Sequence, residues 1–476
     1  MTAPVKEKTT FKPTHYQQLV NGQWEDARSG KRFTRTSPFD GSPVATYPDS
    51  GVADAEAAIV AARHAFDATS WPTRPAAERA GILLRAAKLL RDSADEFTDS
   101  IAREVGKPMW MSDREAPAAA AGFESAARLA VEAHGDAITQ QTPTALGLTI
   151  KEPIGVVGVI TPWNYPLILV ARKVGTALAA GCTVVCKPSH YSSGAALLMA
   201  RVLAEAGLPA GALNVVTSSE DEGALVGQYI SFSDKVDMVT FTGSTDSGKA
   251  VMRAAANNVK RVALELGGKS PNVIFADADL EAAAEGAIAG VFNNSGQICQ
   301  AGSRLLVQKG VKDEVVQRVV RLMGALTLGD PLDPKTKLGP LVNERQLKRV
   351  ERYLSEGKKE ANLVVGGGRP TDHALANGHF IEPTLFDEVD PASSIAREEI
   401  FGPVLSVIEF DSAADAVRIG NDTIFGLAAA VWTKNIDTAI NVAKGLRAGS
   451  LWVNCYHGAG ISGQPFGGYK QSGLGR

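Results

Sequence analysis

Cys299 is the residue of this sequence with the clearest chemical potential. It lies among small and polar residues, in the segment Asn294-Ser-Gly-Gln-Ile-Cys-Gln-Ala-Gly-Ser-Arg304. A thiolate is a strong nucleophile, and a reactive cysteine needs polar surroundings with a base or a dipole nearby. Most lone cysteines are instead buried apolar side chains, which is the interpretation that we favour for Cys182 and Cys186. The four cysteines lack a compact second pair of ligands, so we expect no zinc site and no metal.

Two further polar residues follow apolar, strand-like runs. Glu265 lies in Leu264-Glu-Leu-Gly-Gly-Lys269. A buried carboxylate has a raised pKa and can serve as a general base, although a structural ion pair with a nearby cation fits this segment equally well. Asn164, in Thr161-Pro-Trp-Asn-Tyr-Pro166, could donate its amide to an oxyanion. From that segment alone, a turn residue between two prolines is the favoured interpretation.

A glycine-rich turn, Gly243-Ser-Thr-Asp-Ser-Gly-Lys249, follows an apolar run and precedes a helical pattern. Such a turn at the start of a helix presents N–H groups and the positive end of the helix dipole to a phosphate. The segment nearly matches the phosphate loop of ATPases, but Ala250 has no hydroxyl group for a magnesium ion, so we disfavour an ATPase. By itself the turn supports a phosphate site and a plain helix cap equally.

The elements that would position these residues alternate between strand and helix from about residue 154. Helical patterns separate the strand-like apolar runs at 155–160, 183–186, 213–216 and 238–241. Alternating units of this length predict an α/β fold with mainly parallel sheets and helices on both faces.

Other parts of the chain have their own patterns. A second α/β stretch runs from about 268 to 453, and its part 329–400 is expected to be rich in loops. Asn21-Gly22 predicts a hairpin, and 52–129 has helical periodicity. At about 150 residues per domain, the length corresponds to about three domains.

Composition and charge exclude several classes of protein. Apolar residues make up 45% and charged residues 21% of the 476 residues, which is typical of a folded globular chain. The 49 basic and 52 acidic residues give a net charge of −3, so nothing favours nucleic acid as a partner. The first residues lack the apolar core of a signal peptide, and no apolar run reaches the ~18–20 residues of a membrane span. With only four cysteines, we expect a reducing, cytoplasmic location.

Seven motifs, in this order, resemble those of the aldehyde dehydrogenase superfamily. They are TPWNYP (161–166), CKPS (186–189), FTGST (241–245), ELGGKSP (265–271), GQIC (296–299), EEIFGP (398–403) and PFGGYKQSG (465–473). Each motif is modest alone, but together they cover nearly the whole chain and are highly specific. The resemblance implies an NAD(P)-dependent enzyme that oxidises an aldehyde to the carboxylic acid and releases the acid by hydrolysis.

The resemblance implies a role for each catalytic residue. Cys299 would attack the aldehyde to form a thiohemiacetal, whose oxyanion the side chain of Asn164 and the backbone N–H of Cys299 would hold. Hydride transfer to the nicotinamide would leave a thioester, and Glu265 would activate the water that hydrolyses it. Lys173 matches a family lysine near the active site with a supporting role.

A cofactor groove is also implied. Lys187 would bind the adenosine ribose, Gly243 and Ser244 the pyrophosphate, and Glu399 and Phe401 the nicotinamide side. The full set of expected cofactor residues is Ile160, Thr161, Trp163, Lys187, Ser189, His190, Thr242, Gly243, Ser244, Gly248, Leu266, Glu399 and Phe401.

His190 departs from the pattern of many NAD-preferring relatives, which carry an acidic residue three positions after the lysine. Loss of the carboxylate removes a repulsion against the 2′-phosphate of NADP, and an imidazolium would attract that phosphate. We therefore expect NAD as the cofactor and keep NADP as a hypothesis. The alternative is a surface histidine that leaves NAD dominant.

By the same resemblance, the aldehyde tunnel is expected to be lined by Tyr165, Leu169, Arg172, Ile298, Gln300, His457, Ala459 and Phe466. The aromatic side chains and the small Ala459 favour a medium-sized or aromatic aldehyde. Arg172 indicates a semialdehyde with an acidic tail, although Asn293 stands where succinate-semialdehyde dehydrogenases use a second arginine. A charge on a helix surface explains Arg172 equally well.

Domains follow from the motifs. The resemblance implies two doubly wound parallel-sheet domains, a small β arm for oligomerisation, and a homodimer or homotetramer. A Rossmann-like cofactor domain takes 1–131 and 154–267, the arm 132–153, and the catalytic domain 268–453, while 454–476 returns to the active site. Relatives continue past Arg476 into a tail whose last strand joins the arm, so the sequence as given would leave an unpaired edge there.

Two rival functions differ from hydrolytic oxidation. A relative that transfers the acyl group to CoA generally lacks the glutamate seen here at Glu265. A structural protein on the same fold would usually have lost the nucleophile or the base, whereas Cys299, Glu265 and Asn164 are all present. Water is therefore the expected acyl acceptor.

Overall fold

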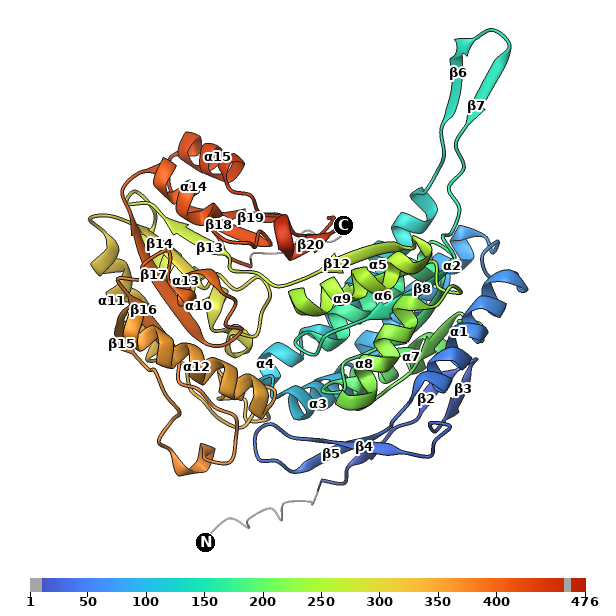
Figure 1. Ribbon diagram of the computed structural model, residues 1–476, viewed down its shortest axis with the longest axis horizontal. Coiled ribbons are helices and arrows are strands. Elements are labelled where there is room, and N and C mark those ends of the chain that lie inside the picture. The colour runs from blue at the N-terminus through green and yellow to red at the C-terminus, as the bar shows by residue number, and fades with distance from the viewer. Residues whose placement is uncertain (1–10, 458–463) are drawn as a thin grey trace.

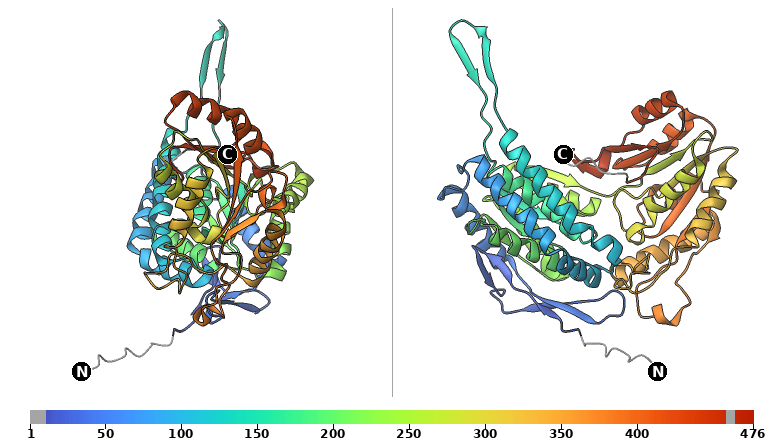
Figure 2. Two further views of the ribbon diagram at one scale, coloured as in Figure 1. Left: turned by 90° about the vertical axis from the view of Figure 1, so that its left-hand side faces the viewer. Right: turned by 180° about the vertical axis from the view of Figure 1, so that it is seen from behind.

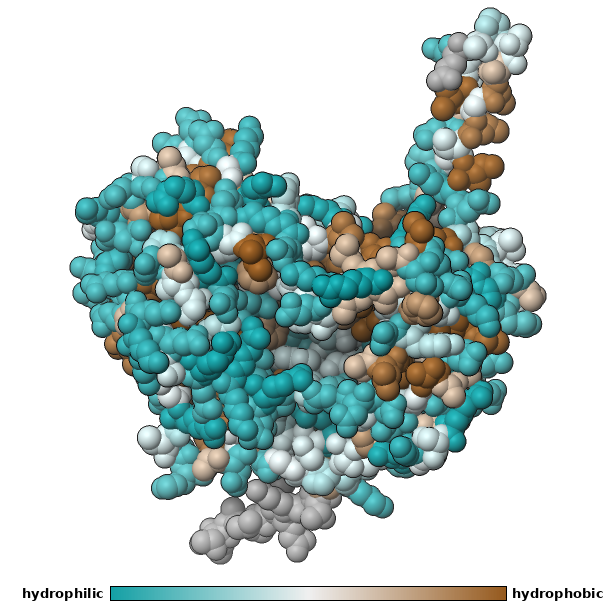
Figure 3. Space-filling model, viewed as in Figure 1, coloured by the Kyte–Doolittle hydropathy of each residue, from teal (hydrophilic) through white to brown (hydrophobic). Residues whose placement is uncertain are grey.

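The computed structural model, which describes residues 11–457 and 464–476, has two halves, and each is built around a large sheet (Figure 1). Both sheets are mainly parallel and carry helices on both faces, which confirms the predicted α/β fold. Figure 2 shows the same two halves from the side and from behind. In the space-filling view of Figure 3, the surface is hollowed between them. None of the helices in the described ranges is long and apolar enough to cross a membrane.

The first sheet has the strand order β20-β12-β11-β8-β9-β10-β2-β3. Its parallel strands are β8 (Val156–Ile160), β9 (Thr183–Lys187), β10 (Leu213–Val215), β11 (Met238–Thr242) and β12 (Arg261–Glu265). The chain runs from β8 through β9 to β10 on one side, and then returns to β11 and β12 on the other. In such sheets, ligands bind beside the carboxyl ends of the strands where the order reverses, which here is between β8 and β11.

Helices cover both faces of this sheet. One face packs against a layer made of α2 (Ala76–Asp92), α3 (Ala94–Val105), α5 (Glu115–Glu132), α6 (Pro166–Ala179) and α7 (Ser193–Glu205). The other face packs against α1 (Val52–Asp67), α8 (Glu220–Phe232) and α9 (Thr245–Ala255). The short α4 (Met109–Ser112) lies between α3 and α5. Pro166 is the first residue of α6, a position whose N–H has no partner within the helix, so the missing N–H of proline costs nothing there.

The edges of the first sheet come from both ends of the chain. β2 (Gln18–Val20) and β3 (Gln23–Glu25) form the hairpin predicted at Asn21-Gly22, where both residues have a positive φ. At the opposite edge, β20 (Gly473–Leu474) pairs antiparallel with β12.

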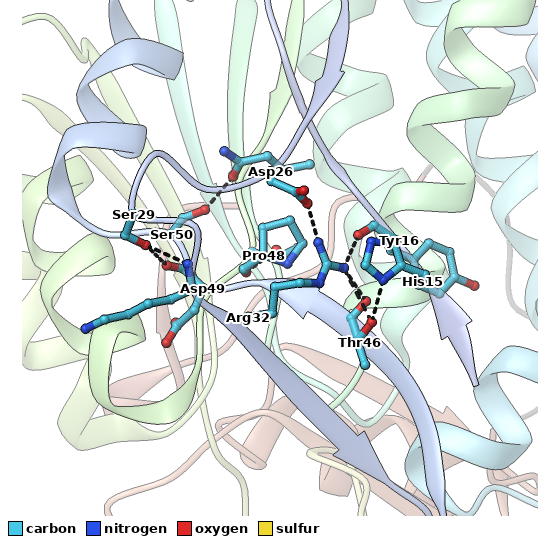
Figure 4. Close-up of polar contacts among 12 residues, drawn as sticks. His15, Tyr16, Asp26, Ser29, Arg32, Thr46, Pro48, Asp49 and Ser50 are labelled. Atoms are coloured by element: carbon cyan, nitrogen blue, oxygen red, sulfur yellow. Dashed lines mark hydrogen bonds and ion pairs between the residues drawn. The ribbon is translucent and has the colours of Figure 1, made fainter. Parts of the chain in front are cut away.

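A small sheet of β1 (Thr14–His15), β4 (Arg32–Thr36) and β5 (Pro43–Pro48) supports the first half. Arg32 holds it together, because its guanidinium pairs with Asp26 and donates to the carbonyl of Thr46 at 3.0 Å (Figure 4). Asp49, directly after β5, accepts a hydrogen bond from the N–H of Ser219 at 2.8 Å. This sheet therefore anchors the loop that opens α8.

The second sheet has the strand order β15-β16-β17-β14-β13-β18-β19. Its strands are β13 (Pro271–Ile274), β14 (Arg304–Gln308), β15 (Asn362–Val365), β16 (Thr384–Asp387), β17 (Val404–Phe410), β18 (Ala428–Trp432) and β19 (Ser450–Val453). All neighbours pair in parallel except β15 with β16. One face packs against α10 (Leu280–Val291) and α11 (Lys312–Met323), and the other against α12 (Glu344–Glu360), α13 (Ser394–Arg397), α14 (Ala413–Asn421) and α15 (Ile436–Gly445). The 3₁₀ turns are η1 (Ala256–Asn258), η2 (Asn293–Gly296), η3 (His373–Leu375) and η4 (Lys470–Ser472).

The segment 329–400, expected to be rich in loops, also contains regular elements that the sequence analysis did not predict, namely α12, β15, β16 and α13. α12 begins at a cap in which Asn343 Oδ1 accepts from the N–H of Gln346 at 2.7 Å. Its buried face consists of Leu347, Val350, Tyr353, Leu354 and Gly357. The rest of the helix is mostly charged, so the apolar stripe is too sparse to dominate the local sequence pattern.

An arm projects from the first half (Figures 1 and 2). It is a hairpin of β6 (Ala137–Thr142) and β7 (Ala145–Leu148), and these strands pair only with each other among the described residues. Apolar side chains stand exposed along it and beyond it, and they are Ile138, Leu146, Leu148 and Ile150. Figure 3 shows this apolar stripe on the arm. Such surface is typical of a protein contact.

Candidate active site

The carboxyl ends of the first sheet and the amino ends of the second sheet meet at the expected site. β12 ends at Glu265, and the chain then crosses to β13 in the second sheet. Cys299 lies just before the amino end of β14. A β-carbon at Gly268 would overlap the carbonyl oxygen of Cys299. The crossing segment therefore brings the strand of Glu265 and the loop of Cys299 into contact.

The loop before Cys299 has an unusual backbone. Its residues 294–296 all have φ between 51° and 74°, in the left-handed region. Each non-glycine residue in that conformation costs of order 1–3 kcal/mol, so the surroundings have to impose it. The hydroxyl of Ser295 donates to the carbonyl of Gly339 at 2.6 Å. A β-carbon at Gly296 would overlap the carbonyl of Gly402, so only glycine fits there.

The thiol of Cys299 is half-buried. Burial, together with the negative charges of Glu399 and Glu265, raises its pKa to about 12. At neutral pH the sulfur therefore carries its proton, and a base has to remove that proton as the sulfur attacks. Glu265 is one of the two carboxylates whose charge acts on the thiol, which makes it a candidate for that base.

Asn164 is buried, and it contacts the nucleophile loop rather than serving only as a turn residue. Its side-chain Nδ2 donates to the carbonyl of Gln297 at 3.0 Å. In return, Nδ2 of Asn294 donates to the carbonyl of Asn164 at 3.2 Å. A carboxamide has two N–H groups, so one remains for an oxyanion while the other fixes the direction of the amide.

Gln297 is a residue that the sequence analysis missed. Besides accepting from Asn164, it accepts at Oε1 from the N–H of Val342 at 2.9 Å, and its Nε2 donates to the carbonyl of Asn294 at 3.0 Å. It is 1% exposed, so all of its polar groups need partners within the protein. Its position two residues before Cys299, among small residues, could have indicated a buried polar residue that supports the nucleophile loop.

Glu265 is half-buried and forms no salt bridge among the described residues. Burial raises its pKa to about 7, although the positive charges of Lys173, Arg172 and Arg476 oppose the rise. Its Oε2 has no hydrogen-bond partner in the described ranges. The carboxylate is thus free to accept a proton near neutral pH, which favours a general base over a structural ion pair.

Lys173 lies on α6, and its Nζ donates to the hydroxyl of Thr240 at 2.7 Å. Burial lowers the pKa of this ammonium to about 8, and the charge of Glu265 opposes the shift. Opposite charges favour each other's ionised form. The positive charge of Lys173 thus favours the carboxylate form of Glu265 near neutral pH.

The expected cofactor residues of the first sheet lie at the carboxyl ends of its strands. At the end of β8 are Ile160, Thr161 and Trp163; at the end of β9 are Lys187, Ser189 and His190; at the end of β11 are Thr242, Gly243, Ser244 and Gly248; and after β12 is Leu266. These strands flank the point where the strand order reverses, which is the usual nucleotide crevice of such a sheet.

The start of α9 fits a pyrophosphate. Ser244 Oγ accepts from the N–H of Ser247 at 3.2 Å, which caps the helix and leaves other first-turn N–H groups for a ligand. The buried hydroxyl of Thr242 has no partner among the described residues. A β-carbon at Gly248 would lie 2.5 Å from the side chain of Leu266, so a larger residue there would push that side chain away. The turn therefore offers anion-binding groups and an open approach.

Lys187 and Gly223 fit a ribose. Nζ of Lys187 is buried, and its only polar contact among the described residues is the carbonyl of Pro188 at 3.4 Å. Burial lowers the pKa of this ammonium to about 8. A β-carbon at Gly223 would lie 3.2 Å from Nζ, so the glycine keeps space beside the ammonium. A buried donor with room beside it suits the hydroxyl groups of a sugar.

His190 is uncharged at neutral pH. Burial, then the positive charges of Lys187, Arg35 and Arg345, lowers its pKa to about 3. Its Nε2 lies 3.7 Å from the carboxylate of Glu220. These surroundings disfavour an imidazolium at this position, and its attraction to the 2′-phosphate of NADP stays a hypothesis.

Two residues from the second half close the groove from the other side. Glu399 Oε1 accepts from the N–H of Gly268 at 2.9 Å, and burial raises the pKa of this carboxyl group. Phe401 has a φ of 60°, and its ring stands edge-on to Trp163 with the centroids 5.5 Å apart. Glu399 therefore reaches the segment that contacts Cys299, since a β-carbon at Gly268 would overlap the carbonyl oxygen of Cys299.

The expected substrate residues divide between α6 and the nucleophile loop. Tyr165, Leu169 and Arg172 are in or just before α6, while Ile298 and Gln300 flank Cys299. Arg172 is exposed, and its guanidinium carbon lies 5.7 Å from the centroid of the Phe466 ring. The positive charge of Arg172 and the aromatic ring of Phe466 therefore lie together among the expected substrate residues.

The C-terminal side of the pocket is tied to the nucleophile loop through Tyr456. Its hydroxyl donates to the carbonyl of Gln300 at 2.7 Å. The ring of His457 packs edge-on to Tyr456, with the centroids 4.9 Å apart, and burial lowers the pKa of His457 to about 4. Ala459 lies outside the described residues.

Comparisons with known proteins identify the family of the chain. The model of the aldehyde dehydrogenase family matches residues 24–476, and the chain belongs to that family. It is 41% identical to betaine aldehyde dehydrogenase of Bacillus subtilis (strain 168), over 96% of this chain and 93% of that protein. The structure of an NAD-dependent aldehyde dehydrogenase from Sinorhizobium meliloti superposes with a TM-score of 0.94 at 43% identity, over 97% of this chain and 91% of that one. Betaine aldehyde dehydrogenase from Staphylococcus aureus, solved in complex with NAD+, gives a TM-score of 0.94 at 36% identity, over 97% and 90%. The chain is thus an oxidoreductase that acts on aldehydes.

Proposed function

We propose that this enzyme oxidises an aldehyde to its carboxylic acid through a thioester on Cys299, with NAD as hydride acceptor and water as the final acyl acceptor. The observation that carries the proposal is the carboxylate of Glu265 beside the thiol. Its pKa is raised to about 7, and its Oε2 has no partner in the described ranges. Hydrolysis of a thioester needs such a base next to the nucleophile.

The residues of the site would act in two stages. First, Sγ of Cys299 bonds to the carbonyl carbon while Glu265 takes the thiol proton, and the resulting oxyanion accepts from the free N–H of Asn164 and from the backbone N–H of Cys299. NAD, when bound, accepts the hydride that leaves this carbon, so that a thioester remains. Glu265 then releases the thiol proton to solvent and is again a carboxylate. Second, it takes a proton from the water that attacks the thioester. The C–S bond breaks, the acid is released, and Glu265 returns this second proton to Sγ.

A spectrophotometric assay tests this function. Absorbance at 340 nm should grow when aldehyde and NAD are mixed with the protein, in the absence of CoA and ATP. A requirement for CoA would identify an acyl-transferring enzyme instead. No signal over a broad aldehyde panel would favour a structural protein on this fold.

The cofactor proposal rests on the residues that line the groove. Lys187 would bind the adenosine ribose, and Gly243 and Ser244 the pyrophosphate at the start of α9. Glu399 and Phe401 would hold the nicotinamide side. The solved NAD+ complex of the Staphylococcus aureus relative supports the choice of NAD.

NAD is expected to be preferred over NADP because Glu220 places a carboxylate beside His190. A 2′-phosphate in this region would be repelled by that carboxylate and would gain nothing from the uncharged imidazole, while the cations around His190, of which Arg345 pairs with Glu220, offset part of the repulsion. In Glu220→Gln, we expect the NAD preference in kcat/KM and in Kd to narrow by about tenfold, equivalent to ~1.4 kcal/mol. His190→Asn, which removes a neutral ring, is the control and should keep the preference. An unchanged preference in Glu220→Gln, measured by calorimetry with both dinucleotides, would contradict the assignment.

For the substrate, we propose a neutral aldehyde of medium size or with an aromatic ring, with a carboxylated semialdehyde as the alternative. Tyr165 and Phe466 supply aromatic surface. The guanidinium of Arg172, stacked near Phe466, would oppose the trimethylammonium group of betaine aldehyde. The substrate in the name of the Bacillus subtilis relative is therefore a poor candidate for this chain.

Replacing Arg172 with leucine tests this charge. In Arg172→Leu, we expect kcat/KM to rise about fivefold for betaine aldehyde and to fall about fivefold for succinate semialdehyde, since one exposed charge contributes about 1 kcal/mol at contact distance. Benzaldehyde, which is neutral, is the matched control and should change least. A parallel change for all three aldehydes would contradict the recognition of charge, because it would show that Arg172 acts on a step common to all of them, such as the protonation of Glu265.

We also propose that the arm of β6 and β7 joins copies of the chain into a homodimer or homotetramer. Its exposed side chains Ile138, Leu146 and Leu148 support this, since a projecting hairpin with apolar residues is stabilised by a partner.

A further inference from the structure

Lys107 and Glu115 form a fully buried ion pair that the proposed reaction does not use. Their side chains are 0% and 1% exposed, and Nζ of Lys107 contacts Oε1 of Glu115. Lys107 lies between α3 and α4, and Glu115 is the first residue of α5. An apolar pair of similar size is often at least as stable as a buried ion pair, so stability alone gives no reason for these charges.

The carboxylate of Glu115 caps another helix. Its second oxygen, Oε2, accepts from the N–H of Leu167 at 3.0 Å and from the N–H of Ile168 at 3.2 Å. These are first-turn N–H groups of α6, and Tyr165, the residue that precedes the helix, provides no side-chain cap. A negative charge at this end is also favoured by the helix dipole. Glu115 therefore caps the N-terminus of α6, a role that the residue preceding the helix does not fill.

The ammonium of Lys107 holds the residue before the helix. Its Nζ lies 3.8 Å from the centroid of the Tyr165 ring, a cation–π contact that is strong when water is excluded. Tyr165 is bonded directly to Asn164, the proposed oxyanion donor. The pair thus fixes both sides of the junction, with the carboxylate on the first turn of α6 and the ammonium on the ring before it.

We propose that Lys107 and Glu115 are positioning residues that aim the side-chain amide of Asn164 at the oxyanion. The inference rests on the proposed function, because it needs an oxyanion formed at the carbon attacked by Cys299. An anion accepts both N–H groups more strongly than a neutral group because the helix dipole adds to the attraction, and a buried anion needs a cation beside it. The hydrogen bond from Nδ2 of Asn164 to the carbonyl of Gln297 fixes the side-chain amide. The ion pair fixes the backbone that follows Asn164.

The test uses two double variants that differ in one functional group. Lys107→Met/Glu115→Leu replaces the pair with apolar side chains and removes the cap. Lys107→Met/Glu115→Gln also removes both charges, but the carboxamide oxygen can still accept from Leu167 and Ile168. Both variants avoid an unpaired buried charge, so both should fold with thermal midpoints near that of the wild type.

Two reactions of Cys299 separate positioning from structure. Alkylation by iodoacetamide forms no oxyanion, so its rate should stay within about twofold in both variants. Attack of the thiol on p-nitrophenyl acetate forms a thioester and releases nitrophenol through an oxyanion. We expect this acylation to slow about tenfold or more in the leucine variant and to recover to within about threefold of wild type in the glutamine variant.

Each outcome decides the inference. Acylation at the wild-type rate in the leucine variant, in a protein whose wild type oxidises aldehydes, overturns the positioning role and leaves the proposed function intact. Equal loss of alkylation and acylation also overturns it, because the pair would then only maintain the fold around the thiol. Failure of wild-type Cys299 to be acylated at all counts against the oxyanion site itself, and so against both proposals.

Discussion

Alanine in place of Cys299 is expected to abolish aldehyde oxidation and to leave NAD binding intact. Without Sγ no thiohemiacetal forms, so the hydride has no tetrahedral carbon to leave, and we expect kcat/KM to fall about 10⁴-fold or more. The groups that would hold the dinucleotide, such as Lys187 and the turn before α9, belong to other segments of the chain. The Kd for NAD, measured by calorimetry, should therefore stay within about twofold.

Cys455 offers a matched control for this experiment. It is the other half-buried free thiol, since Cys182 and Cys186 are buried. Cys455→Ala should retain activity, and prior alkylation of the wild type should block turnover in proportion to the label found on Cys299. Measurable turnover by Cys299→Ala, or loss of activity in Cys455→Ala with an intact fold, would show that the nucleophile is misassigned.

Glutamine in place of Glu265 is expected to trap the thioester. The amide cannot take a proton from water or from the thiol of Cys299, so both stages should slow. The thiol can still lose its proton to solvent, so we expect hydride transfer to occur once, more slowly than in the wild type, while hydrolysis slows further, by about 10²–10⁴-fold. Rapid mixing with NAD and aldehyde should give a burst at 340 nm of about one equivalent per subunit, followed by slow turnover. Mass spectrometry of the quenched protein should then find the acyl group on Cys299. The exposed Glu285 provides the control variant Glu285→Gln, which should turn over normally.

The pH dependence of hydrolysis adds a second readout. The pKa of Glu265 is raised to about 7, and only its carboxylate form accepts a proton from water. Hydrolysis in the wild type should therefore increase with pH, reach half of its maximum near pH 7, and decrease about tenfold per pH unit well below that value. This step should be missing from the residual hydrolysis of Glu265→Gln. A Glu265→Gln enzyme that turns over at the normal rate without a burst would rule out the base assignment.

Much of the fold could be predicted because its signals are local. Parallel strands such as β8 are buried on both faces and therefore appear as continuous apolar runs. The residues that surround the site follow directly after such runs, as Glu265 follows β12 and Gly243 follows β11. Because parallel strands end at the same edge, local patterns were enough to bring these segments together.

What could not be predicted depends on distant partners. α12 was missed because its charged exposed face outweighs its buried stripe. Glu115 lies far along the chain from Leu167, and nothing near either residue indicates that one caps the other. The charge state of His190 depends on burial and on the cations placed around it, Lys187, Arg35 and Arg345, which come from separate segments.

The left-handed loop before Cys299 also has a consequence for the order in which the enzyme becomes active. Ser295 and Gly296 hold their strained backbone against the carbonyls of Gly339 and Gly402, which come much later in the chain. During synthesis on the ribosome, the thiol therefore leaves the exit tunnel long before the groups that shape its loop. The first half can form its nucleotide crevice early, while the cysteine acquires its catalytic geometry only after most of the second sheet has been made. A ribosome-bound chain stalled before Gly402 should bind NAD more weakly than the full chain, because Glu399 and Phe401 are still inside the tunnel, and should not oxidise aldehydes.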